Sequence, residues 1–201
     1  DRPAAINGDL NLALRGYSAT TAVPALIDIG GPTDDDAPQL AALFSPPRKP
    51  AISAVFRVHE WNWNCGANGC RGGAIPYPPV TMIALSTQLG EKLYLPARNA
   101  EIYGGGYKAL VLYADERRIT IKYTREDSPV WGYTIHLEEI GVDPSLLLKY
   151  REMDAAGRRN LPALRNGDLV GYAIAPTVKV AVRDTGMFMD PRTRKDWWKG
   201  Y

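Results

Sequence analysis

The stretch LVGYAIAPTVKVAVRDTGMFMDPR, which runs from Leu169 to Arg192, decides the fold class of this chain. Within residues 178–182, valine alternates with Lys179 and Ala181. A period of two residues puts successive side chains on opposite faces of an extended backbone, so this segment predicts a β-strand with one face in a core. Gly186 comes shortly after it, where a turn is expected.

The same alternation extends over much of the chain after residue 50. Ile52, Ala54, Phe56 and Val58 are expected on one face of a half-buried strand that continues into Trp61. Similar runs lie at Val80–Leu85, Lys92–Leu95, Ala109–Ala114, Ile119–Tyr123 and Gly132–Leu137. Gly, Pro or charged residues separate these runs. Together they predict a mainly β fold, an antiparallel sandwich or barrel.

Only one helix is predicted to interrupt the strands. Asp143 is a good N-cap residue, and Pro144 suits the first helical position. The apolar residues after them fall on one face of a helix, and these are Leu146, Leu147, Tyr150 and Met153.

The first 50 residues have a different character, since they hold seven of the sixteen prolines. Short strands are expected at Asn11–Tyr17 and Ala22–Gly30, and a helical turn or two at Ala37–Phe44. We predict an extended N-terminal arm over 1–50 and a β domain over 51–201. The arm's leucines need cover, from its own domain or from a neighbouring copy, so self-association through the arm is a further expectation.

Composition narrows the function classes. The chain has 201 residues, 45% of them hydrophobic, and a net charge of +2 with acids and bases interspersed. That charge is too small and too scattered to indicate a nucleic-acid partner, and the apolar runs are too short for membrane insertion. Residues 193–201 form a basic and aromatic tail, whose charges are expected in solvent. A first residue that is not Met predicts a removed secretory signal, hence a secreted or cell-surface protein.

Two cysteines, Cys65 and Cys70, are close enough in sequence to close a small loop. A cysteine pair with no cysteine left over fits an oxidising compartment and favours a disulfide. The alternative is a metal site, for which His59 and Glu60 are the only nearby additional ligands.

The stretch from Leu169 to Arg192 resembles the closing strands of the lysostaphin-type zinc endopeptidases. That family has His-x-His-x-x-Val-Arg where this chain has Thr177 to Arg183, and Gly186 and Asp190-Pro191 match the family's residues beyond that motif. The resemblance continues, more weakly, over Ile83–Tyr123 with its YGGGY segment. It implies a lysostaphin-like core over 80–192.

The same resemblance implies that the zinc chemistry is missing. The two histidine positions fall on Thr177 and Lys179, and the family's upstream His-x-x-x-Asp pair falls near Val80 and Ala84. None of these side chains is a suitable zinc ligand. The chain is therefore interpreted as a degenerate, non-catalytic barrel with no cofactor, a pseudoenzyme. A broader likeness to a set of uncharacterised secreted bacterial proteins extends over most of the chain and implies no activity.

His136 lies in a segment with a likeness of its own. Tyr133 to Leu137 resembles the Tyr-x-His-Leu that supplies a proton-handling histidine in the same family, which would give His136 that role. A register that puts Tyr123-Thr124-Arg125 there needs no insertion and is preferred. A single His on an alternating strand is more often structural.

Aromatic residues offer another candidate site. Trp61 and Trp63 alternate with Asn62 and Asn64, and Tyr103 and Tyr107 lie in the barrel-like region. Aromatic faces beside amides suit sugar recognition, but the same residues also suit a core or a subunit interface. The acidic turn at 34–36 is either a solvated turn or a calcium site.

These observations are compatible with three functions. The first is a non-catalytic extracellular structural or interaction protein built on the degenerate barrel. The alternative is a glycan- or peptidoglycan-binding module that uses cell-wall glycan as its partner. The third is a cell-wall hydrolase with a site that these motifs do not reveal.

Overall fold

The structure is a computed structural model that describes residues 2–201, and it is mainly β, with antiparallel sheets and few helices. This confirms the predicted fold class at that level. The strands are β1 (Tyr17–Ala19), β2 (Ile52–Asn62), β3 (Cys70–Ala74), β4 (Met82–Ser86), β5 (Lys92–Tyr94), β6 (Tyr107–Asp115), β7 (Arg118–Lys122), β8 (Tyr133–Glu138), β9 (Ile140–Val142), β10 (Ala163–Arg165), β11 (Leu169–Ala173), β12 (Thr177–Asp184) and β13 (Met187–Phe188).

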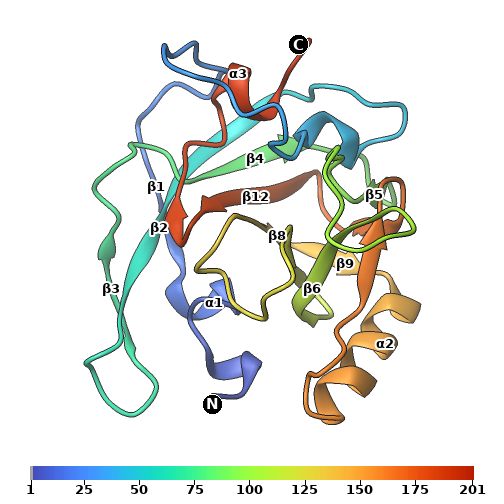
Figure 1. Ribbon diagram of the computed structural model, residues 1–201. Helices are drawn as coiled ribbons and strands as arrows, with labels where there is room; N and C mark the ends of the chain where they lie inside the picture. Colours follow the sequence, from blue (N-terminus) through green and yellow to red (C-terminus); the bar gives the residue numbers. More distant parts are fainter. Residues whose placement is uncertain (1) are drawn as a thin grey trace.

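The strands form two sheets (Figure 1). The larger sheet has the order β1-β2-β4-β12-β8-β7-β6-β10, with β3 paired to β2 and β13 paired to β12. The smaller sheet has the order β5-β11-β9. β12, the strand predicted from the alternating valines, lies near the centre of the large sheet. Its place there agrees with its valines being fully buried.

Helices are few and mostly short. They are the 3-10 turns η1 (Ala4–Ile6) and η2 (Leu40–Leu43) and the α-helices α1 (Leu12–Arg15), α2 (Pro144–Ala155) and α3 (Arg194–Trp197). Only α2 is longer than one turn, and it begins as predicted, because the Asp143 side chain accepts hydrogen bonds from the backbone N–H groups of Ser145 and Leu146. None of the helices in residues 2–201 has the length and apolar character needed to cross a bilayer.

One face of the large sheet carries the main hydrophobic core. Val178, Val180 and Val182 of β12 pack there together with Ile135 and Leu137 of β8. The core is completed by apolar residues from the smaller sheet, from α2, from η2 and from the C-terminal tail, which include Leu93, Val170, Leu146, Leu43 and Trp198. This face is therefore an ordinary apolar interior.

The opposite face is polar and is also buried. Three rows of register partners cross β7, β8 and β12: Lys122–Thr134–Arg183, Thr120–His136–Ala181 and Arg118–Glu138–Lys179. Partners that lie directly opposite in adjacent strands point to the same face. We call this surface the polar face. The first two rows are almost fully buried, even though five of their six members are polar or charged.

The N-terminal segment covers the polar face. Thr120 donates to the Leu10 carbonyl oxygen at 2.6 Å, and Arg183 contacts the Asp9 carboxylate at 3.0 Å. Leu12 packs with Phe188 of β13 in a small apolar cluster above the same face. The predicted arm thus packs on its own domain, which buries Leu10, Leu12, Leu40, Leu43 and Phe44, whereas Val23 and Ile29 are 68% and 49% exposed.

Three predictions for the terminal segments were wrong. Asn11–Tyr17 is not a strand, because the Asn11 side chain accepts the Ala13 N–H and starts the helical turn α1, leaving only Tyr17 in β1. Ala22–Gly30 makes one isolated bridge, Ile27 to Thr193, instead of a strand. The tail is not simply solvated, since Trp197 and Trp198 are buried and α3 lies against the rest of the chain (Figure 1). The turn expected within Ala37–Phe44 is present as η2.

Candidate functional site

Three of the four positions that the proposed resemblance aligns with histidine or aspartate lie on two adjacent strands. Thr177 and Lys179 belong to β12 and pair with Ser86 and Ala84 of β4. Val80 is buried just before β4 begins. Lys179 is thus directly opposite Ala84. In the sequence, only the resemblance connects these positions. In the sheet, Lys179 and Ala84 lie side by side.

Lys179 is held in a polar network. Its ammonium group bonds to the Glu139 carboxylate, which also accepts a hydrogen bond from the Tyr17 hydroxyl at 2.9 Å. The Lys179 nitrogen lies 5.1 Å from the centre of the Tyr17 ring, within cation–π range. Burial opposes the charged form of Lys179, but the bonds to Glu139 and Tyr17 outweigh it and raise its pKa. The position therefore holds a fixed cation.

His136 is buried at the centre of the polar face. Thr120 uses its only hydroxyl proton on the Leu10 carbonyl, so the 2.9 Å contact from Thr120 to His136 Nδ1 requires a proton on Nδ1. The Nε2 atom then carries a lone pair and has no partner among the described residues. Burial lowers the pKa of His136 well below its usual range, and the nearby Arg183 and Arg15 lower it further. His136 is a neutral, enclosed imidazole.

The Asp9 carboxylate, which pairs with two arginines, links the N-terminal segment to the large sheet. Asp9 pairs with Arg15 at 2.5 Å and with Arg183 at 3.0 Å. Burial works against ionisation of Asp9, but the two guanidinium groups prevail and lower its pKa. Arg15 also donates to the Gly8 and His59 carbonyl oxygens. This network is structural, because each of its donors bonds to the protein itself.

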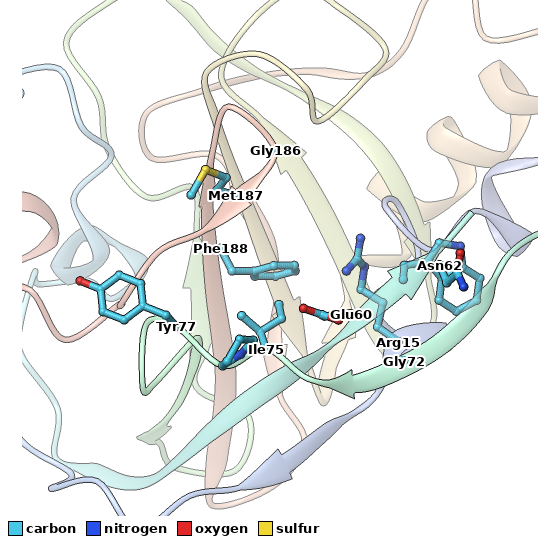
Figure 2. Close-up of a pocket in the computed structure, with 11 residues that line it drawn as sticks. Arg15, Glu60, Asn62, Gly72, Ile75, Tyr77, Gly186, Met187 and Phe188 are labelled. Carbon is cyan, nitrogen blue, oxygen red and sulfur yellow. The ribbon is translucent and has the colours of Figure 1, made fainter. Parts of the chain in front are cut away.

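One open groove, of about 680 Å3, lies between the β2–β3 hairpin and β13. Figure 2 shows Tyr77 at one end, Asn62 and Arg15 at the other, and Phe188 and Ile75 between them, with Glu60 pointing into the middle. We call it the β3–β13 groove. Its lining residues come from segments far apart in the sequence, and these are Arg15, Glu60, Trp61, Asn62, Gly72, Ile75, Pro76, Tyr77, Gly186, Met187 and Phe188.

The groove has an apolar rim and uncommitted polar groups. Tyr77 is 82% exposed and Met187 is 70% exposed. No ion pair or side-chain hydrogen bond engages the Glu60 carboxylate among residues 2–201, and the Asn62 side chain bonds only through Oδ1, to the Asn64 N–H at 2.9 Å. A carboxylate and an amide donor therefore face a space flanked by aromatic rings.

The aromatic residues singled out in the sequence do not form one site. Trp61 lines the groove and meets Trp63 edge-to-face at 6.1 Å, but Trp63 lies beyond the groove and under Arg2. Tyr103 and Tyr107 belong to another region, where Arg125 and Arg165 lie over their rings. Sequence reasoning missed Arg15, Tyr77 and Phe188, since no local motif connects three segments that only the sheet brings together.

Cys65 and Cys70 form the predicted disulfide at the tip of the β2–β3 hairpin. The metal alternative is thereby wrong for these sulfur atoms, and His59 instead lies 2.7 Å from the Ser18 hydroxyl. In the acidic turn, Asp34 accepts from the Tyr133 hydroxyl and Asp35 pairs with Lys199. Across residues 2–201, no three His, Cys, Asp or Glu side chains gather as metal ligands would.

No protein-family model matches the chain, and no curated protein does. Two features of the structure therefore bear on function: the polar network around Lys179, and the β3–β13 groove.

Proposed function

We propose that this chain is a non-catalytic extracellular interaction protein built on a degenerate lysostaphin-type barrel. The observation that carries the proposal is the state of Lys179, an ammonium group paired with Glu139 at a position where that family has a zinc ligand. A fixed cation disfavours a divalent metal at the same place. The register of Lys179 against Ala84 supports the alignment, since ligands to one metal must be neighbours.

Two further observations support an extracellular interaction role. A disulfide with no free cysteine left over is typical of proteins from oxidising compartments. The exposed apolar rim of the β3–β13 groove supports a binding function, because exposed apolar patches on soluble domains often mark contact sites. Tyr77 and Met187 are the residues we assign to partner contact.

A carbohydrate is the second candidate for the groove. Trp61 and Tyr77 supply ring faces, while Glu60 and Asn62 supply an acceptor and a donor that no protein group fully engages. Hydroxyl groups of a neutral sugar can donate a hydrogen bond to the Glu60 carboxylate and accept one from the Asn62 amide. This combination supports the glycan-binding alternative at the groove but not at Tyr103 or Tyr107.

The non-catalytic assignment is tested by metal analysis of the purified protein together with a cell-wall clearing assay. We expect no stoichiometric zinc and no clearing. One tightly held zinc per chain, or clearing that a chelator abolishes, would contradict the proposal and favour the hydrolase alternative.

The groove is tested with Tyr77→Ala and Met187→Ala in binding measurements against cell-wall fragments and glycan arrays. Both side chains are exposed, so folding should be unchanged while binding falls at least tenfold. Leu89→Ala is the matched control, because Leu89 is 79% exposed on a different surface. If all three variants weaken binding equally, the groove is not the binding site.

Self-association through residues 1–50 remains a prediction. Light scattering on the full chain and on a variant that lacks residues 1–45 tests it. A larger mass for the full chain is expected, and a monomeric mass for a well-folded full chain would contradict it.

A further inference from the structure

Lys122 has an unusual environment that the proposed function does not use. Its side chain is 0% exposed, and its ammonium nitrogen has no hydrogen-bond partner among residues 2–201. Lysine is almost never fully buried unless it is paired, because removal of its solvation costs several kcal/mol. A buried cation without a partner therefore needs an explanation, and an unobserved ion is one of the few available.

On β6 the apolar Leu110 lies directly opposite Lys122, and on the other side its neighbours are a donor and a cation. Thr134 lies directly opposite on β8, and Arg183 lies opposite Thr134 on β12. The Thr134 hydroxyl is also fully buried and has no partner among the described residues. Lys122 and Thr134 thus present adjacent, unused hydrogen-bond donors on the covered polar face.

The Lys122 ammonium group has no directly bonded counter-charge among residues 2–201. The nearby arginines, Arg183 and Arg15, bond to one shared carboxylate, that of Asp9, and Glu60 also attracts Arg15 through space. Glu126 and Asp184 attract Lys122 only through space and form no bond with it. Burial, helped by the nearby charge of Arg183, lowers the pKa of Lys122 to about 8, against the attraction of Glu126 and Asp184. A bound negative charge would relieve both effects.

We propose that Lys122 and Thr134 bind a small inorganic anion of the size of chloride, enclosed between the polar face and the N-terminal segment. A water molecule could satisfy the donors, and it could also bond to the lone pair on His136 Nε2, but it would leave the ammonium group without a directly bonded counter-charge. An organic anion is excluded by the complete burial of Lys122, Thr134 and His136. This site is separate from the β3–β13 groove and independent of the function proposed for it.

The experiment is a thermal unfolding series in sodium chloride, with sodium gluconate at equal ionic strength as the reference, because gluconate is too large to enter. Above the dissociation constant, Tm should rise by roughly 3–5 °C for each tenfold increase in chloride relative to gluconate. Lys122→Met keeps the length of the side chain and removes charge and donors, so its Tm should not distinguish the two salts. Lys149→Met, at an exposed position of α2, is the matched control and should respond as the native chain does.

Two outcomes would overturn the proposal: equal Tm values in chloride and gluconate for the native chain, or a chloride response that persists in Lys122→Met. Should Lys122→Met fail to fold, crystals of the native chain grown in bromide give a second test. We expect one ordered bromide within hydrogen-bonding distance of the Lys122 nitrogen. A water at that place, with no anomalous signal, would show that the site holds water only and refute the proposal.

Discussion

On the central strands β7, β8 and β12, both faces of the large sheet are largely buried, and they are held by different forces. The core face packs valines, isoleucines and leucines, whose burial is favourable without precise orientation. The polar face packs Lys122, His136, Glu138 and Arg183, whose burial is tolerated only where bonds or counter-charges replace water. Complete burial on this sheet therefore does not identify the core, and the polar face depends on what covers it.

The largest expected effect comes from the covering carboxylate. Asp9→Asn should leave Arg15 and Arg183 buried without a counter-charge and cost about 4 kcal/mol of unfolding free energy, in the range found when one partner of a buried pair is removed. Urea denaturation measures it. Asp28→Asn is the matched control, since the Asp28 pair with Arg194 is exposed and worth at most about 1 kcal/mol. Equal losses in the two variants would mean that the polar face does not depend on Asp9.

A cavity on the core face should cost slightly less. Ile121 is fully buried in the main core, on β7 beside Lys122. Ile121→Ala should lower the unfolding free energy by about 3 kcal/mol through lost burial and an unfilled cavity. Chemical denaturation measures this loss. Ile121→Val is a milder control, for which a loss of about 1 kcal/mol is expected. If Ile121→Ala lowers the unfolding free energy by much more than Asp9→Asn does, the core face contributes more to stability than the polar face, against this prediction.

The fold was predictable where one face of a strand is apolar. Alternation predicted β4, β6, β7, β8 and β12 to within about two residues, and the Asp143 cap predicted α2. The start of the chain was misread although its signals were present, since Asn11 and Gly16 are good residues to begin and end a helical turn. A strand such as β3, which contains Gly72 and Gly73, has little strand propensity and forms because β2 pairs with it.

The site was less predictable than the fold. Trp61 and the disulfide were anticipated from local patterns, because the residues concerned are neighbours in sequence. The meeting of Arg15, Glu60 and Phe188 in the groove, or of Asp9 and Arg183 on the polar face, depends on strand order and register. No local pattern contains that information.

The polar face should also give the protein a distinct pH dependence. Burial raises the pKa of Glu138 to about 7, against the attraction of Arg118. The folded chain then holds a proton that the unfolded chain releases above its ordinary pKa of 4.5, so stability contributed by Glu138 falls as pH rises from about 4.5 to about 7. Unfolding free energies at pH 5 and pH 7.5 should differ by about 2 kcal/mol more in the native chain than in Glu138→Gln. An identical difference in both proteins would contradict the raised pKa.

The smallest loss of stability is expected from removal of the disulfide at the tip of the β2–β3 hairpin. Cys65→Ser with Cys70→Ser opens a loop of very few residues, so the entropy model predicts a loss of about 2 kcal/mol or less. Thermal denaturation measures it, and thiol titration of the unfolded, unreduced native chain should find no free thiol. A loss comparable to that of Asp9→Asn would show that the hairpin contributes to the cover of the polar face.

The contact between Asp9 and Arg183 also constrains how the chain reaches its native state. These residues are 174 positions apart. Closing so long a loop has a high entropic cost, and proteins rich in such contacts fold slowly. Until β12 is in place, the segment before β1 has no sheet to dock on, so the buried charges are expected to remain hydrated until late in folding. The cover of the polar face is then a late step in refolding, later than the pairing of β6, β7 and β8, whose strands are neighbours along the chain.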